Sequence, residues 1–465
     1  MSRWLNRATL NIDRMQFRAS TAALGTAPCI ALSLTFPIAL SIALALILPV
    51  ISLQAQELRE RLKDANGVRD DVWVYNNIPR AIAEAKRVNK PLFVTFRCVP
   101  CKDCAAFDAD VANGNERVRQ IAQEKFVAVR QVEMKGVDLS QFQFDHDLNW
   151  AAMFIHPDGT VFARYGTQSA EGSDAYNSID GLVATMQRVL DLHANYPANK
   201  AELAGKLGTP RPQNDALQMP GLRNPAKYAQ ETNRSNCIHC HNIHDAEHQH
   251  ALDNNTYSVE MLYKYPLPDN IGLQIDRKSG VRIEKVAPNS PAARAKIEPG
   301  EEIVRMNGQR ITSIADMQWV LHQLPFNDAT VTVECNKTGK HELTLAPGWK
   351  KYDFSWRGSM WNAPPRLQVW LPEVTGDSLT KLQLPQTDSA LEVRWINQGG
   401  KGGQQAYADG LREKDIVIAC AGEPIRMNSR QFNAHLRLHY HVGDELPLTI
   451  LRGGKKMELK IRLVE

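Results

Sequence analysis

The sequence predicts a multidomain protein in which a small α/β domain precedes two related α+β domains of mostly β structure. Helix and strand signals alternate from residue 75 to 190, which is the pattern of a layered α/β fold. Later, "SPAARAKIEPGEEIVRMNGQRI" at 290–311 is matched by "QAYADGLREKDIVIACAGEPI" at 405–425. This wide spacing indicates two copies of one domain, because solenoid units are shorter and more numerous.

The first 56 residues are predicted to be a signal peptide or a membrane anchor. Four arginines lie within the first 18 residues, and no charged residue follows from Ala19 to Gln56. About twenty apolar residues can span a bilayer, whereas a signal peptide usually has a shorter apolar core. Both readings stay open. In either case we expect the rest of the chain in the periplasm or on the outer face of the inner membrane. This segment is then its only contact with the membrane.

Composition narrows the possible functions of the exported part. The formal net charge is +4, and removal of four arginines and one aspartate leaves +1, so nothing favours nucleic acid as a partner. Five of the eight cysteines form two tight clusters, namely Cys98, Cys101 and Cys104, then Cys237 and Cys240. A disulfide framework would spread its cysteines. Clustered cysteines in an oxidising compartment indicate redox or metal chemistry.

The stretch "PLFVTFRCVPCKDC", residues 91–104, runs from an apolar strand into the start of a helix. Unpaired N–H groups and partial positive charge at a helix start favour a thiolate there. Cys101 lies one helical turn beyond Cys98, and Pro100 suits the first turn. Cys104 lies one turn further along. We expect these three cysteines to be catalytic; three soft thiolates that bind a metal are the alternative.

This stretch resembles the thioredoxin-like class. "FRCVPCK" is similar to the Trp-Cys-Gly-Pro-Cys-Lys run of thioredoxins, and the preceding "AIAEAKRVNKPLFVTF" is similar to the helix and strand that lead into it. The resemblance places a thioredoxin-like domain at 57–200. It implies that Cys98 is the attacking thiol and Cys101 the resolving thiol. Arg97 stands where thioredoxins have tryptophan, and "LNWAAMF" has no proline where they have a cis-proline, which argues against a general protein-disulfide reductase.

Residues 201–266 are predicted to be a linker that carries "CIHCH". The spacing of Cys237, Cys240 and His241 is that of c-type haem attachment, in which His241 would ligate the iron. Met261 is the preferred second iron ligand. Zinc is the alternative cofactor, held by Cys237, Cys240, His244 and His248. An unliganded loop or a local disulfide is the third possibility.

The segments "DNIGLQID" and "VRIEKVAPNSPAARAKIEPGEEIVRMNGQRI" resemble a PDZ domain of exported bacterial proteases, over 267–349. The resemblance implies that the loop Asn270, Ile271, Gly272 and Leu273 binds the C-terminal carboxylate of a protein or peptide. Residues 350–465 are predicted to hold a second PDZ-like domain, without a recognisable carboxylate loop. The serine nucleophile elbow G-x-S-x-G and the zinc motif H-E-x-x-H are absent from the sequence.

The order of these parts resembles a family of exported bacterial thioredoxin-like/PDZ proteins, some of whose members contain selenocysteine. We therefore expect an exported redox protein that acts by thiol–disulfide exchange, by haem-mediated electron transfer, or by both. Its PDZ domains would dock a partner protein, and a redox partner protein would exchange electrons with it. The alternative is a non-enzymatic PDZ scaffold whose Cys/His cluster binds zinc.

Overall fold

The computed structural model describes residues 56–64, 66, 72–99, 105–385 and 387–465, which belong to one compact unit. The predicted signal or anchor segment lies outside these residues, as do Cys101 and Cys104. Among the described helices, none is both long enough and apolar enough to cross a membrane.

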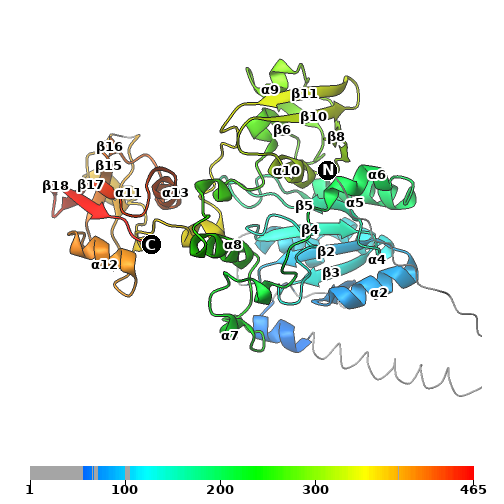
Figure 1. Cartoon of the computed structure of the whole chain (residues 1–465), viewed down its shortest axis with the longest axis horizontal. Coiled ribbons are helices and arrows are strands. Elements are labelled where there is room, and N and C mark those ends of the chain that lie inside the picture. The colour runs from blue at the N-terminus through cyan, green and yellow to red at the C-terminus, as the bar shows by residue number, and fades with distance from the viewer. Residues whose placement is uncertain (1–55, 65, 67–71, 100–104, 386) are drawn as a thin grey trace, which may run out of the picture. The chain divides into compact units, whose positions relative to one another are not determined.

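The α/β domain is built on a five-stranded sheet with the strand order β1-β3-β2-β4-β5 (Figure 1). The pairs β1–β3 and β2–β3 are parallel, whereas β2–β4 and β4–β5 are antiparallel. All six residues of β2 are buried, as expected for a central strand covered on both faces. The strands are β1 Trp73–Tyr75, β2 Leu92–Arg97, β3 Val127–Gln131, β4 Trp150–Ile155 and β5 Val161–Tyr165.

Helices cover the two faces of this sheet and create two separate cores. The first core contains the inner faces of η1, α4 and α5, and the second contains Ala81 and Ala85 of α2. Helix α2 begins where the Asn77 side chain accepts a hydrogen bond from the Arg80 N–H at 3.0 Å, a regular N-cap. The helices are α2 Ile78–Val88, α3 Ala105–Ala109, η1 Asp110–Gly114, α4 Glu116–Lys125 and α5 Ile179–Ala194.

The segment 201–266, which we expected to be a linker, packs onto the α/β domain instead. Helix α8 contributes Ile243 and Ala246 to the second core, and Cys237 belongs to the first core. The prediction missed this because the segment lacks long apolar runs, yet a few well-placed side chains fill the cores. The helices in this segment and at its two ends are α6 Lys200–Leu203, η2 Ala204–Lys206, η3 Ala216–Gln218, α7 Pro225–Tyr228, α8 His241–Asp253, η4 Val259–Leu262 and η5 Pro268–Ile271.

The first β-rich domain follows, with a sheet in the order β11-β10-β8-β9 and the smaller pair β6-β7. Residues Ile314 to Leu321 of α10 are all buried. Part of this burial comes from the α/β domain, because the Arg164 N–H and the Thr167 hydroxyl bond to Asp316 and Gln318. The elements are β6 Leu273–Ile275, β7 Ile283–Val286, α9 Pro291–Arg294, β8 Ile303–Met306, β9 Gln309–Arg310, α10 Ile314–His322, β10 Ala329–Cys335 and β11 Gly339–Leu345.

The second β-rich domain repeats this arrangement, as the sequence repeat predicts. Its sheet has the strand order β18-β17-β15-β16, which corresponds to the order β11-β10-β8-β9 of the first β-rich domain. The domain has a core of its own. The elements are η6 Gly358–Asn362, β12 Val369–Trp370, α11 Gly376–Lys381, β13 Leu391–Glu392, β14 Trp395–Ile396, α12 Lys401–Ala408, β15 Ile416–Cys420, β16 Glu423–Pro424, α13 Ser429–His439, β17 Glu445–Arg452 and β18 Lys455–Arg462.

Candidate functional site

Cys98 lies directly after β2, at the carboxyl end of a strand that is parallel to β3. The residue is disulfide-bonded and only 7% exposed. Its N–H donates to the carbonyl oxygen of Asn149 at 3.4 Å, just before β4 begins. Asn149 therefore stands beside Cys98 in the "LNWAAMF" segment, where the sequence has no proline. The predicted partners Cys101 and Cys104 lie outside the described residues.

The two cysteine motifs of the sequence meet at this point. Nδ1 of His239 lies 2.9 Å from Sγ of Cys98, although the residues are 141 positions apart. The backbone N–H of His239 donates to Oδ1 of Asn242 at 3.0 Å, which ties the histidine to the first turn of α8. His239 is not among the site residues predicted from the sequence. Its position between Cys237 and Cys240 was the signal that could have identified it, but the motif treats this position as a spacer.

A buried ion network lies next to Cys98. Nε of Arg97 lies 3.2 Å from Asp108, and Arg130 bonds to both Asp108 and Asp64 at 2.7 and 2.9 Å. Burial alone would raise the pKa of Asp108, but the hydrogen bond and charge of Arg130, with the charge of Arg97, hold it below its usual value. Two guanidinium groups and two carboxylates make the network neutral. Arg97, which replaces the thioredoxin tryptophan, therefore anchors the end of β2 by charge pairing.

Cys237 and Cys240 are free, buried thiols. Cys237 packs in the first core and Cys240 in the second, and they are 4% and 6% exposed. Burial is the main cause that raises the pKa of Cys237 above its ordinary value and that of Cys240 to about 12. Both thiols are therefore protonated and shielded at neutral pH.

This placement does not fit the predicted haem. Thioether bonds to one porphyrin need both sulfurs on one open face, whereas here the two sulfurs belong to different cores. Nδ1 of His241 lies 3.1 Å from Asp245. Met261 is half-buried in η4. We therefore derive no reaction step through haem from this arrangement.

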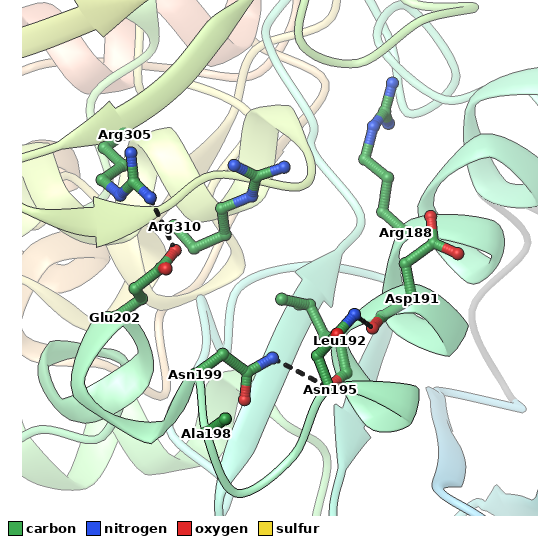
Figure 2. Close-up of a pocket in the computed structure, with 9 residues that line it drawn as sticks. All are labelled: Arg188, Asp191, Leu192, Asn195, Ala198, Asn199, Glu202, Arg305 and Arg310. Atoms are coloured by element: carbon green, nitrogen blue, oxygen red, sulfur yellow. Dashed lines mark hydrogen bonds and ion pairs between the residues drawn. The ribbon is translucent and has the colours of Figure 1, made fainter.

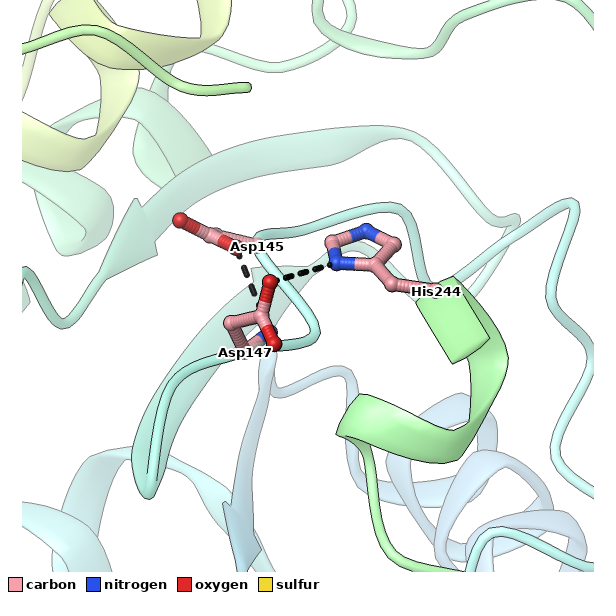
Figure 3. Close-up of side chains that lie close together, drawn as sticks. All are labelled: Asp145, Asp147 and His244. Carbon is pink, nitrogen blue, oxygen red and sulfur yellow. Dashed lines mark hydrogen bonds and ion pairs between the residues drawn. The ribbon is translucent and has the colours of Figure 1, made fainter. Parts of the chain in front are cut away.

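The four predicted zinc ligands do not come together either. Among the described residues, only Asp145, Asp147 and His244 place three ligand atoms within 4.8 Å of one another (Figure 3). Nδ1 of His244 lies 3.0 Å from Asp147. His248 is buried, and neither of its ring nitrogens has a hydrogen-bond partner in the described part of the chain. Cys237 and Cys240 take no part in this group.

The aspartates in Figure 3 are already satisfied by protein groups. Arg357 bonds to Asp145 at 2.7 and 2.8 Å and to Asp147 at 3.1 Å. Ser359 donates both its N–H and its hydroxyl to Asp147 at 2.8 Å. Burial alone would raise the pKa of Asp147, but the hydrogen bond and charge of His244, then the charge of Arg357 and the Ser359 N–H, hold it well below its ordinary value. The cluster therefore joins three distant segments without needing a metal.

The predicted carboxylate loop has a defined backbone in the first β-rich domain. Ile271 ends η5, Gly272 has φ +89°, and Leu273 begins β6. A Cβ on Gly272 would lie 2.1 Å from Ser290, so both the conformation and the space require glycine. Ile271 and Leu273 are fully buried, and Oδ1 of Asn270 accepts a hydrogen bond from the Lys351 N–H at 2.7 Å.

A cavity of about 390 Å³ lies between α5, α6 and the first β-rich domain (Figure 2). Arg188, Arg305 and Arg310 line it together with Asp191 and Glu202. Arg305 pairs with Glu202 at 3.0 Å. Three arginines thus face two carboxylates in this cavity, and we assign it no ligand.

Family models match two parts of the chain. The model described as thioredoxin-like matches residues 73–157, and the PDZ domain model matches residues 262–334. The chain therefore contains a thioredoxin-like domain followed by a PDZ domain, as the sequence motifs predicted. The first match covers β1 to β4 of the α/β domain, including Cys98, and the second covers the part of the first β-rich domain with the carboxylate loop.

Similarity to whole proteins is weaker. A probable periplasmic serine endoprotease DegP-like of Marinomonas sp. (strain MWYL1) is 23% identical over 200 residues, which covers 43% of this chain and 40% of the relative. The magnetosome formation protease MamE of Magnetospirillum gryphiswaldense is 22% identical over 222 residues, 41% of this chain and 28% of the relative. The chain thus spans less than half of the length of these relatives.

Two solved structures of the HtrA-type protease AlgW with decapeptide, one of them of a substituted form, are similar over smaller parts. They share 19% and 12% identity, cover 21% and 30% of this chain and 28% and 50% of their own chains, and both give a TM-score of 0.19. TM-scores this low do not show that the whole folds are similar.

Proposed function

We propose that the protein is a thiol–disulfide oxidoreductase that acts through Cys98. The observation that carries this proposal is the place of Cys98, disulfide-bonded at the carboxyl end of β2 in a thioredoxin-like domain. A strand end beside a helix start favours a reactive sulfur. The substrate class is a protein thiol or disulfide, and the redox partner is another protein.

In the oxidised protein, a substrate thiolate attacks one sulfur of the Cys98 disulfide. A mixed disulfide forms, the Cys98 disulfide breaks, and the sulfur that leaves becomes a thiolate. A second substrate thiolate then breaks the mixed disulfide, so two substrate thiols become one disulfide and the protein gains two electrons and two protons. The reverse sequence reduces a substrate disulfide.

The test is thiol–disulfide exchange between the purified protein and a model peptide that carries a dithiol or a disulfide. We expect Cys98→Ser to abolish exchange and Cys101→Ser to accumulate a mixed disulfide through Cys98. Cys335→Ser is the matched control, because Cys335 is a free cysteine buried in the core of the first β-rich domain. Exchange that persists unchanged in Cys98→Ser would rule out the proposal.

The PDZ domain is proposed to dock the C-terminus of a partner protein at Asn270, Ile271, Gly272 and Leu273. The register of β6 with β7 pairs Leu273 with Val286, and the other edge of β6 has no strand partner among the described residues, which is where an added strand would pair. The second β-rich domain is proposed to be a PDZ-like module on its repeated sheet order.

Export to the periplasm is proposed from the uncharged N-terminal stretch and from the weak similarity to a probable periplasmic endoprotease.

Titration with C-terminal peptides tests the docking proposal. Binding should require the free carboxylate, and equal binding of amidated peptides would contradict the loop assignment.

A further inference from the structure

We propose that His239 is a catalytic residue of the Cys98 centre and accepts the proton of the Cys98 thiol. This inference rests on the proposed thiol–disulfide function and adds a group that the thioredoxin-like match at 73–157 does not contain. It also gives the "CIHCH" segment a role in which neither haem nor zinc takes part.

The geometry is that of a nucleophile with an adjacent base. Nδ1 of His239 lies 2.9 Å from Sγ of Cys98, which is within hydrogen-bond reach for a sulfur and nitrogen pair. A cysteine beside a histidine reacts faster, because the imidazole takes the thiol proton and the imidazolium then stabilises the thiolate.

The surrounding residues hold His239 in this position. Cys237 and Cys240 are buried on either side of it, in two different cores, and its own N–H is bonded to Asn242. The buried cysteines therefore fix the short loop that carries the histidine. Small apolar side chains at both positions would suffice for this task, because free cysteine packs as a small hydrophobe.

The titratable groups that face His239 are Cys98 and His241, whose ring centroid lies 5.5 Å from that of His239. The carboxylate of Asp245 pairs with His241 at 3.1 Å. No acid is hydrogen-bonded to His239 among the described residues, so the thiolate of Cys98 is the anion that would stabilise its protonated form.

The proton of the reduced Cys98 thiol passes to Nδ1 of His239, and the thiolate attacks one sulfur of a substrate disulfide. The substrate S–S bond breaks while a mixed disulfide forms at Cys98. The leaving substrate thiolate takes the proton from the imidazolium. The resolving thiol completes the exchange, and a dithiol of a partner protein reduces the centre again.

The experiment uses the full chain with Cys101→Ser and Cys104→Ser, so that the reaction of Cys98 is measured without its two neighbouring cysteines. The rate of reaction of reduced Cys98 with oxidised glutathione is measured against pH, for the parent and for His239→Asn and His239→Ala. Asparagine keeps a hydrogen-bonding group near the position of Nδ1 but cannot take up a proton. His250→Asn is the matched control, since His250 is exposed on α8.

We expect both His239 variants to react about tenfold more slowly at pH 7, and their rates to rise with pH toward the ordinary thiol pKa of about 8.5. Equal thermal unfolding of the oxidised variants would separate this effect from damage to the fold. A parent-like rate–pH profile in His239→Asn would overturn the inference, since a hydrogen bond alone would then suffice. Persistent exchange in Cys98→Ser, by contrast, would remove the proposed function itself.

Discussion

Arg357 donates two parallel hydrogen bonds to Asp145, from Nη1 to Oδ1 at 2.7 Å and from Nη2 to Oδ2 at 2.8 Å, across 212 positions of sequence. Both side chains are almost completely buried, at 2% and 5% exposure. The pair fastens the segment before η6 to the loop before β4 of the thioredoxin-like domain. Paired geometry of this kind is the strongest arrangement for two buried charges.

Arg357→Met should therefore destabilise the protein strongly. It leaves Asp145 and Asp147 buried without their cation, and breaking a buried pair from one side typically costs about 3–5 kcal/mol. Denaturant unfolding measures the loss. Arg394→Gln is the control, because its pair with Glu392 is solvent-exposed and such pairs contribute little to stability. Similar losses in the two variants would show that the buried pair does not hold the segments together.

Acidification should weaken the fold through His248. Burial, together with the charges of Lys264 and His244, lowers its pKa in the folded protein from 6.5 to about 4. The unfolded chain then binds a proton that the folded chain does not, so stability is complete above pH 6.5 and falls as the pH drops toward 4. The slope for one such histidine is at most about 1.4 kcal/mol per pH unit.

Denaturant unfolding at a series of pH values checks this expectation. His248→Gln should flatten the slope between pH 6.5 and 4, whatever its effect on stability at pH 7. His250→Gln, at an exposed position of the same helix, should leave the slope as in the parent. An unchanged slope in His248→Gln would assign the acid sensitivity to other groups.

Gly272→Ala should both destabilise the PDZ domain and abolish peptide binding. Its φ of +89° disfavours any side chain, and the new methyl group would meet Ser290. Gly300→Ala isolates the backbone effect, since Gly300 has φ +85° with no atom within 4 Å of the added carbon. We expect about 1–2 kcal/mol for Gly300→Ala and a clearly larger loss for Gly272→Ala, measured as unfolding midpoints.

Local patterns in the sequence were sufficient for the order of domains and for the position of Cys98. The apolar run before Cys98 is long enough to identify β2, and the repeated turns identify two β-rich domains. Neither the pairing of Cys98 with His239 nor that of Asp145 with Arg357 could be predicted, because 141 and 212 residues separate the partners. Such contacts depend on how domains and loops pack, and the hydrophobic periodicity of a sequence predicts only local structure.

The segment with Cys237, Cys240 and His241 shows the same limit of prediction from sequence alone. The spacing of Cys237 and Cys240 is compatible with haem attachment, with metal binding or with plain burial, because spacing does not say which way the side chains point. Their division between two cores is a tertiary property of the α/β domain. The apolar residues Ile238, Ile243 and Ala246 around the motif were the signal for packing.

The structure leads to a direct prediction for Cys237 and Cys240. Both thiols are buried and their pKa values are raised, so alkylation in the folded protein should be slow and should become rapid in denaturant.

The mass of the denatured protein, produced with a working haem-attachment system, should show no added haem. A haem mass that disappears in Cys237→Ala/Cys240→Ala would contradict the described arrangement and restore the sequence motif as a haem site. If instead the mass of Cys237→Ala/Cys240→Ala differs from the parent mass only by the two lost sulfur atoms, and the variant still exchanges disulfides through Cys98, the two cysteines serve the site through packing alone.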